Sequence, residues 1–186
     1  MVQRSLRGVT IECVRGDITR QPDMDAIVNA ANAHLRAGGG VAGAIHFAAG
    51  PELESECRAL APIRPGQAVI TGAHRLPNQF VIHCLGPVYG RDEPAEELLA
   101  ACYRNALRLA TEGELGSIAF PAISTGIFGY PLASAAEVAV RAVVEYVLQA
   151  SAPVITRVRF VLFDAQAERI FADAIEQAYA QFTPTG

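Results

Sequence analysis

Short apolar runs alternate with longer helical patterns along almost the whole chain, and this alternation is what most restricts the fold. Strand-like runs occupy residues 8–14, 26–28, 68–73, 80–85, 117–120 and 158–163. Helical patterns occupy residues 42–49, 51–60, 94–110, 131–147 and 170–178. Strands separated by helices indicate a sheet that is covered on both faces. We therefore predict an α/β fold, a three-layer α/β/α sandwich with about six strands.

The two runs at 68–73 and 80–85 are joined by a short turn around Pro77 and Asn78. A connection this short favours antiparallel neighbours, so the predicted sheet is mixed. The chain has 186 residues, which fits a single domain spanning 1–186. Its core is expected at about 9–182, with a short frayed tail at 183–186.

Composition excludes several classes of protein. Hydrophobic residues make up 51% and charged residues 18%, which is incompatible with a disordered chain. The net charge of −4 argues against a duplex nucleic acid partner. No apolar stretch approaches the ~20 residues that span a bilayer, and the first residues show no signal-peptide pattern. We expect a cytoplasmic monomer with no membrane partner and no cofactor. The four cysteines lack zinc spacing, so no metal site is predicted.

The segment Gly16-Asp17-Ile18-Thr19 directly follows the first strand-like run. One interpretation is a turn in which Asp17 is the N-cap of a helix. The other is a carboxylate at the sheet edge that accepts a hydrogen bond from a ligand amino group. The residues alone leave both interpretations open.

A second segment combines two asparagines with a run of glycines. Asn29 and Asn32 follow the strand at 26–28, and Gly38, Gly39 and Gly40 then lead through Val41 into a helix of small residues. Glycines let a backbone approach a ligand closely, and a helix N-terminus offers free N–H groups and a positive dipole end. These features predict a phosphate or pyrophosphate site, the alternative being a flexible loop. The spacing does not fit a dinucleotide fingerprint, because the glycines do not directly follow the strand.

A third segment, residues 121–131, lies between a buried strand and a helix. Ser124, Thr125 and Gly126 form a small, amide-rich turn at the carboxyl end of a strand, where open α/β sheets bind ligands. Ile127 follows, and then Phe128 stands between glycines, either as a lid over a flat ligand or as a plug into the core. His83 lies within an apolar strand pattern, which favours a core histidine over a catalytic base.

Together these segments resemble the macrodomain family in both order and spacing. The resemblance rests on Gly16–Thr19, Asn29–Asn32, Gly38–Gly43 and Ser124–Gly129, and it extends to the strings at 81–87 and 161–164. It covers almost the whole chain. It implies a three-layer α/β/α fold that binds ADP-ribose or a mono-ADP-ribosylated protein.

The resemblance also implies a role for each segment. Asp17 would bind the adenine amino group beside the Ile18 backbone, and Phe163 would pack on the adenine ring. The Ser124–Phe128 loop would hold the diphosphate through its amides. Asn32 and the run Gly38–Gly40 would face the distal ribose. The candidate catalytic residues are therefore Asn32, Gly39 and Gly40, with Asn29 and Val41 among the binding residues.

Two positions depart from the hydrolytic members of the family. Hydrolytic macrodomains resembling the human mitochondrial type carry an Asp where this chain has Ala42. Viral members that hydrolyse carry a His before the glycines, where this chain has Ala37. The sequence thus leaves two functions open. One is a hydrolase that removes ADP-ribose from glutamate or aspartate, or cleaves O-acetyl-ADP-ribose or ADP-ribose 1″-phosphate. The other is a reader module that binds ADP-ribose without chemistry.

Overall fold

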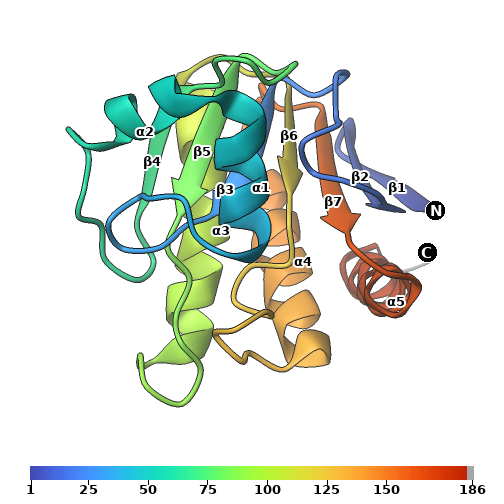
Figure 1. The fold of residues 1–186 in the computed structure, drawn as a ribbon. Coiled ribbons are helices and arrows are strands. Elements are labelled where there is room, and N and C mark those ends of the chain that lie inside the picture. The colour runs from blue at the N-terminus through green and yellow to red at the C-terminus, as the bar shows by residue number, and fades with distance from the viewer. Residues whose placement is uncertain (184–186) are drawn as a thin grey trace.

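The computed structural model describes residues 1–183 and contains one seven-stranded sheet with helices on both of its faces (Figure 1). The strands are β1 Val2–Leu6, β2 Val9–Arg15, β3 Ala26–Ala30, β4 Ala68–Gly72, β5 Phe80–Cys84, β6 Ser117–Phe120 and β7 Arg157–Leu162. The helices are α1 Gly40–Ala49, α2 Pro51–Cys57, α3 Ala95–Glu112, α4 Leu132–Gln149 and α5 Ala165–Phe182. The expected α/β/α sandwich is confirmed.

The strand order in the sheet is β1-β2-β7-β6-β3-β5-β4. β2, β7, β6, β3 and β5 are parallel, whereas β1 and β4 pair antiparallel with their neighbours at the two edges. The predicted antiparallel pair of β4 and β5 is confirmed, and so is the mixed character of the sheet.

The sheet has one strand more than the sequence patterns predict, because β1 lies before the expected start of the core at residue 9. Its residues Gln3, Arg4 and Ser5 are polar and exposed, so the segment lacks an apolar run. Polar and charged residues are common on edge strands, where they discourage pairing with other chains. β1 joins the sheet by pairing with β2 from Val2↔Cys13 to Leu6↔Val9. The other predicted elements are present with shifted ends, and the expected frayed tail lies outside the described residues from 184 onward.

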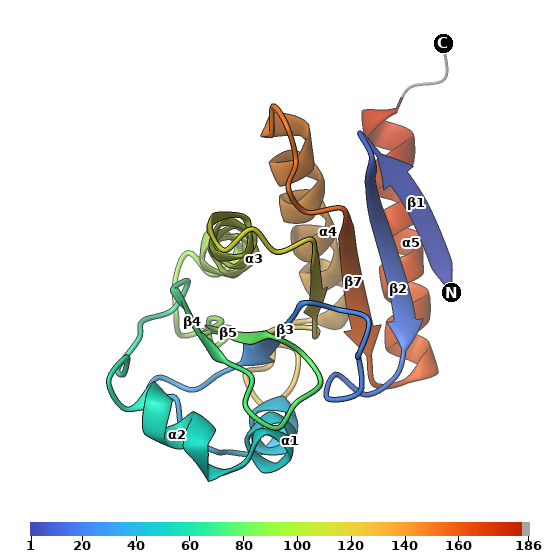
Figure 2. The same ribbon diagram turned by 90° about the horizontal axis from the view of Figure 1, so that it is seen from above.

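The two faces of the sheet are covered differently (Figure 2). α3, α4 and α5 cover one face and build the larger apolar core, in which the aromatic rings of Tyr103, Phe120, Phe160 and Phe171 contact one another. α1 and α2 cover β3, β4 and β5 on the opposite face and build a smaller core. No helix among residues 1–183 is both long enough and apolar enough to cross a membrane.

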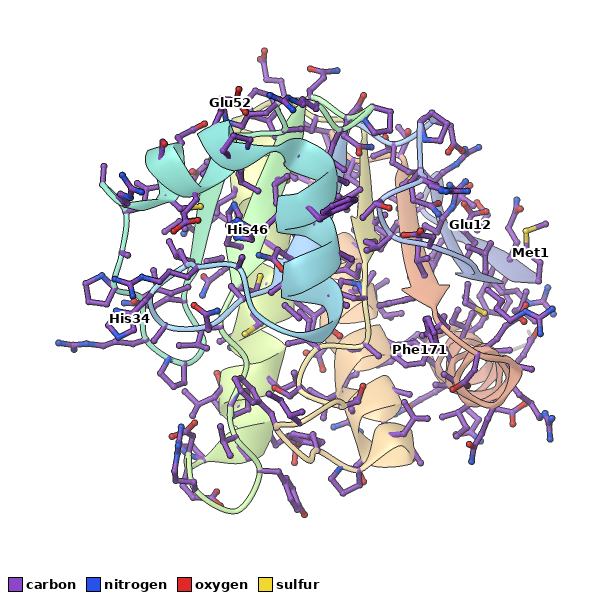
Figure 3. The ribbon with its side chains drawn as sticks, viewed as in Figure 1. Met1, Glu12, His34, His46, Glu52 and Phe171 are labelled. Carbon is purple, nitrogen blue, oxygen red and sulfur yellow. The ribbon has the colours of Figure 1, made fainter. Side chains whose placement is uncertain are left out.

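The β2–β7 part of this second face carries polar groups in place of a helix. Glu12 and Arg159 face each other across the two strands, and the Arg159 Nε atom donates to Glu12 Oε1 at 2.8 Å. The segment between β2 and β3 covers them, with Gln21 and Asp23 also bonded to Arg159. Figure 3 shows Glu12 on this half of the sheet, away from α1. The loop that leaves β2 is therefore fastened to the sheet by hydrogen bonds.

Candidate functional site

The predicted site segments meet at one edge of the sheet. Since β2, β3, β5, β6 and β7 run in the same direction, the loops that follow them all leave at the carboxyl edge, the lower end of the sheet in Figure 1. These loops contain the segments 16–19, 31–39, 85–94, 121–131 and 163–164. Ligands of open α/β sheets bind at this edge. The structure thus brings together the three segments singled out in the sequence.

Asp17 forms a tight turn with one carboxylate oxygen and leaves the other available to accept a hydrogen bond. Its Oδ1 atom accepts from the Thr19 N–H at 2.9 Å and from the Thr19 hydroxyl at 2.7 Å. These two bonds, the hydroxyl first, lower the pKa of the carboxyl, which is therefore ionised at neutral pH. Its Oδ2 atom accepts no hydrogen bond from residues 1–183 and lies 3.8 Å from Nε of Arg20, at ion-pair distance. The expectation that Asp17 caps a helix is wrong, because residues 16–25 form turns and no helix begins there, whereas the predicted turn is present. A ligand-binding role of the carboxylate stays a prediction.

Phe163 lies beside this turn in the sheet order. The Gly16 N–H donates to the Leu162 carbonyl at 2.9 Å, so Asp17 and Phe163 leave the sheet from neighbouring strand ends. The Phe163 side chain is 93% exposed, whereas Ile18 is buried in the smaller core. An exposed phenyl ring beside an ionised carboxylate is a suitable surface for a flat base with an amino group.

The glycine run ends at the first turn of α1. Gly40 has φ +59°, and Gly39 precedes it as the N-cap, where no side chain caps the helix. The first turn also contains no acidic residue, so its N–H groups and positive dipole end meet no local anion. A Cβ atom at Gly43 would collide with the Gly38 carbonyl, which explains why the helix begins with small residues. An anion such as a phosphate suits this helix end.

Asn32 braces the loop that leads to the glycine run. Its Nδ2 atom donates to the Arg36 carbonyl at 2.8 Å, and its Oδ1 atom accepts from the Arg36 N–H at 3.0 Å. Leu35 between them is buried and has φ +55°. A side chain at Gly38 would lie 3.3 Å from the Asn32 amide nitrogen, so the two residues are neighbours. Asn32 is thus half-buried and close to the glycines, as the predicted role requires.

Asn29 lies beneath the edge, buried in the sheet. Its Nδ2 atom is 3.0 Å from Nδ1 of His83, and His83 Nε2 is 2.9 Å from the Thr71 hydroxyl, which donates to the Gly72 carbonyl. Burial lowers the pKa of His83 to about 3, with a smaller contribution from His46. The expectation of a hydrogen-bonded core histidine is confirmed. In this structure Asn29 therefore supports the site from below.

The Ser124–Phe128 loop combines strain with open space. Ser124 has φ +67°, and its buried hydroxyl has no hydrogen-bond partner within the described chain. Thr125 bonds the Ala122 carbonyl at 2.8 Å, whereas a Cβ at Gly126 would meet no atom within 4 Å. Ile127 is 98% exposed. A turn with free space at its tip and strained backbone is typical of a ligand-binding loop.

Phe128 connects this loop to its neighbour. Its side chain is half-buried against the smaller core, and its carbonyl accepts from the Tyr89 N–H at 2.8 Å. The Tyr89 and Tyr130 rings lie 4.9 Å apart in the same region. Gly86 leaves no room for a side chain, because a Cβ there would collide with Ser124. The loops after β5 and β6 therefore pack together. The Phe128 side chain is partly packed against the smaller core and partly exposed at the surface.

Sequence reasoning missed His46, which lies one helical turn after Ala42 on the same face of α1. The imidazole is buried, and its Nε2 atom has no partner among residues 1–183. Burial lowers its pKa, so the ring is neutral at pH 7. The spacing of four residues from Ala42 was the available signal, since helix residues i and i+4 share a face.

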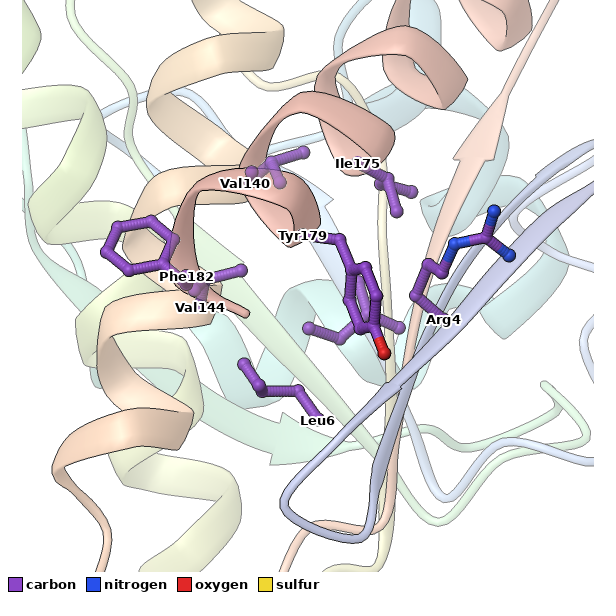
Figure 4. A pocket seen from close by; sticks show the side chains of 9 residues that line it. Arg4, Leu6, Val140, Val144, Ile175, Tyr179 and Phe182 are labelled. Atoms are coloured by element: carbon purple, nitrogen blue, oxygen red, sulfur yellow. The ribbon is translucent and has the colours of Figure 1, made fainter. Parts of the chain in front are cut away.

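The described residues contain no group of His, Cys, Asp or Glu side chains that could hold a metal ion. An apolar pocket between β1, α4 and α5 lies away from the carboxyl-edge loops; Figure 4 shows Tyr179 and Phe182 of α5 and Leu6 of β1 among its walls. Its lining offers few polar groups and none of the predicted site residues. The carboxyl edge thus remains the candidate site.

The chain is similar to characterised proteins over nearly its full length. It is 48% identical over 172 residues to the O-acetyl-ADP-ribose deacetylase of Salmonella typhimurium, covering 90% of this chain and 94% of that protein. A macro domain-containing protein of Streptomyces griseus is 47% identical over 171 residues, with 89% and 94% covered.

Solved structures give the same picture. The Oceanobacillus iheyensis macrodomain with ADP superposes with a TM-score of 0.92 at 38% identity, covering 97% of both chains. The Trypanosoma brucei macrodomain in complex with ADP-ribose gives a TM-score of 0.83 at 35% identity, covering 89% of this chain and 68% of that one. The family profile described as Macro domain matches residues 28–139. The chain belongs to the macro domain family.

Proposed function

We propose that this protein binds ADP-ribose at the carboxyl edge of the sheet and hydrolyses ADP-ribosyl esters, with O-acetyl-ADP-ribose as the first substrate to test. The observation that carries the proposal is the convergence at one edge of an Asp17 carboxylate oxygen that accepts no hydrogen bond from the described residues, a helix N-terminus without a side-chain cap and an open amide-rich loop. The similarity to the O-acetyl-ADP-ribose deacetylase of Salmonella typhimurium supports the choice of substrate.

In the proposed complex the ligand runs from the turn after β2 to the glycine run. Asp17 accepts the adenine amino group, with the Ile18 backbone beside it, and the exposed ring of Phe163 stacks on the base. The diphosphate occupies the open space at Gly126, where the loop amides of residues 124–128 surround it. The N-terminus of α1 follows β3, the neighbour of β6 in the sheet, and its positive dipole end favours negative charge on the same ligand.

The distal ribose then lies against Asn32 and the glycine run Gly38–Gly40, beside Val41. In an ester at the anomeric carbon, water attacks C1″ and loses a proton, the bond from C1″ to the ester oxygen breaks, and the carboxylate leaves, so the products are ADP-ribose and a carboxylic acid. The carboxylate is a good leaving group, so orienting the water and stabilising the developing negative charge contribute most. The second amide hydrogen of Asn32, which the bond to Arg36 does not use, and the backbone N–H groups of Gly39 and Gly40 supply these effects.

No carboxylate stands at Ala42 to take a proton from the water. General-base catalysis contributes about 10²- to 10⁴-fold, so this protein should turn over more slowly than a relative with Asp at that position. The same reasoning extends the proposal to ADP-ribose linked to glutamate or aspartate and to ADP-ribose 1″-phosphate, since each presents a leaving group of low pKa.

A reader module is the second candidate function, and Ala42 and Ala37 favour it because they remove both side chains associated with hydrolysis in the family. A reader would bind ADP-ribose equally well and release nothing. The two functions therefore differ only in turnover.

The deciding experiment compares the wild-type protein with Ala42→Asp and Asn32→Ala. Product release is measured from O-acetyl-ADP-ribose, from a glutamate-linked ADP-ribosyl protein and from ADP-ribose 1″-phosphate, and binding of ADP-ribose is measured by calorimetry. We expect Asn32→Ala to reduce turnover at least about tenfold, equivalent to about 1.4 kcal/mol in the barrier. Its effect on ADP-ribose affinity should be much smaller.

Ala42→Asp should raise the rate by placing a carboxylate on the face of α1 that ends at the glycine run. Ala42→Asn is the matched control, because it has the same size without the basic oxygen pair. If wild type and Ala42→Asp both release nothing above the uncatalysed rate while binding ADP-ribose, the protein is a reader. If ADP-ribose does not bind at all, both functions are wrong.

A further inference from the structure

The segment that carries Asp17 is fastened to the sheet by a side chain from a different strand. Arg159 of β7 donates from Nε to Glu12 Oε1 at 2.8 Å, from Nη1 to Gln21 Oε1 at 2.9 Å, and from both Nη atoms to the Asp23 carboxylate at 2.8 and 2.7 Å. Its side chain is 12% exposed and that of Glu12 is 5% exposed. One guanidinium therefore joins two strands to the loop above them.

Gln21 connects Arg159 to the turn that carries Asp17. Its Oε1 atom accepts from Arg159, while its Nε2 atom donates to the main-chain carbonyl of Asp17 at 2.8 Å. Gln21 is 7% exposed, so both bonds are shielded from water. The Asp17 carbonyl also accepts from the Arg20 N–H at 3.0 Å, which closes the turn.

The loop is held from the other side as well. Asn78, in the turn between β4 and β5, donates from Nδ2 to the carbonyls of Gln21 at 2.8 Å and Met24 at 2.7 Å. Gln21 is thus fixed at its backbone by one neighbour and at its side chain by another. The position of the Asp17 carbonyl follows from these fixed points, and Thr19 then fixes one carboxylate oxygen relative to the turn.

We propose that Arg159 and Gln21 are positioning residues that set the nucleobase specificity of the site. They hold the Oδ2 atom of Asp17 in the position where it accepts a hydrogen bond from the 6-amino group of adenine. A purine without that amino group gains nothing from the arrangement. This inference rests on the proposed function, because it requires the base to lie at Asp17.

The guanidinium suits this task better than an ammonium would. Its planar fork reaches Glu12, Gln21 and Asp23 at the same time, whereas a lysine at this position carries the charge without the fork. The carboxylate of Asp23 raises the pKa of Arg159 further, and the Arg159 contact lowers the pKa of Asp23, so the pair stays ionised.

Arg157 provides a matched control on the same strand. It lies two residues away on the same face and contacts Asp23 at 3.3 Å, but its side chain is 44% exposed and no contact joins it to Gln21. A purely electrostatic role of the cluster would involve both arginines. Positioning through Gln21 would involve Arg159 alone.

The test measures two dissociation constants by calorimetry for each variant, one for ADP-ribose and one for the analogue whose purine lacks the 6-amino group. We expect the wild type to prefer ADP-ribose by about tenfold or more, the effect of a hydrogen bond to a charged group. Gln21→Leu removes both amide contacts and leaves the Arg159 bonds to Glu12 and Asp23, so it should fold. It should reduce the preference to about twofold with little change in analogue affinity.

Arg159→Lys should reduce the preference in the same direction, and Arg157→Gln should leave it unchanged. Unchanged preference in Gln21→Leu would overturn the inference, and so would an equal loss of affinity for both ligands, which indicates a merely structural loop. A wild-type protein that binds neither ligand would overturn the proposed function and this inference with it.

Discussion

Two aspartates at opposite edges of the sheet differ in how many of their carboxylate oxygens accept hydrogen bonds. Asp25, at the amino edge where β3 begins, uses both carboxylate oxygens: Oδ2 accepts from the Gly116 N–H at 2.8 Å and the Ser117 N–H at 3.1 Å, and Oδ1 from Gln79 at 3.2 Å. Asp17, at the carboxyl edge, uses Oδ1 for Thr19, whereas Oδ2 accepts no hydrogen bond from the described part of the chain and lies 3.8 Å from Nε of Arg20.

The same difference extends to the surroundings of the two residues. Asp25 ties together the starts of β3, β5 and β6, since its backbone also bonds the Ser117 hydroxyl and the Gln79 N–H. At the carboxyl edge, Ser124 has a strained backbone and an unpartnered buried hydroxyl. Hydrogen-bonding capacity left open at one edge is available to a ligand, whereas capacity used at the other edge stabilises the fold.

Asp25→Ala should have the largest effect, and the effect should be on stability. The substitution removes three acceptor contacts and leaves two backbone N–H groups without a partner, which should lower the free energy of unfolding by about 3 kcal/mol or more. Chemical denaturation measures this loss, and Asp25→Asn should lose less because one acceptor oxygen remains. ADP-ribose affinity of the folded protein should stay the same; a large change in affinity would break the contrast between the edges.

Gly126→Glu should have the largest effect on binding. A Cβ atom at Gly126 would meet no atom of the described chain within 4 Å, so the variant should fold normally. Its carboxylate would occupy the proposed diphosphate space and repel the phosphates, which should reduce affinity at least about 100-fold, or about 2.7 kcal/mol. Gly126→Gln separates bulk from charge. Binding within a few-fold of wild type, together with a native circular dichroism spectrum, would show that this loop does not hold the diphosphate.

Asp17→Ala should reduce ADP-ribose affinity by about 1.5–3 kcal/mol, the range for a hydrogen bond to a charged group. Calorimetry with a ribose-phosphate fragment that lacks adenine is the control, and there the loss should be much smaller. Equal losses with both ligands would mean that Asp17 acts only through its turn with Thr19, as Asp25 acts through its strand ends.

The sequence predicts the buried strands and the helices of the fold better than it predicts the edge strand β1. Periodic apolar patterns identify the buried strands and the amphipathic helices, because burial on one face determines their spacing. The apolar pattern does not identify β1, because its residues Gln3, Arg4 and Ser5 are polar and all three are exposed. An edge strand is stabilised by backbone pairing with β2, which leaves little trace in the side-chain pattern.

The candidate site shows a similar division. The segments around Asp17, Gly38–Gly40 and Ser124 can be found in the sequence because turns and close approaches need particular residue types. The bracing contacts of Arg159 and Gln21 cannot, because they join residues 138 positions apart whose proximity depends on the order of the strands. The occupied amide of Asn32 also depends on a loop conformation that no local pattern encodes.

The smallest effect concerns the layer beneath the carboxyl edge, where His83 is buried in its neutral form. Its pKa is about 3 in the folded protein and about 6.5 in an unfolded chain, so the unfolded state binds the proton first as the pH falls. The contribution of His83 to the free energy of unfolding is therefore fully present above pH 6.5 and declines below it. Between pH 7 and 5.5 the expected loss from this residue is about 1 kcal/mol. Burial also lowers the pKa of His46, which adds in the same direction.

His83→Gln keeps an amide nitrogen near the Thr71 hydroxyl without a group that titrates, and it should flatten this part of the pH dependence. His34→Gln, at an exposed position, is the control for the loss of a histidine that is not buried. The free energy of unfolding at pH 7, 6 and 5.5 measures the effect before most carboxylates begin to titrate. Equal slopes for wild type and His83→Gln would show that protons enter the unfolded chain elsewhere.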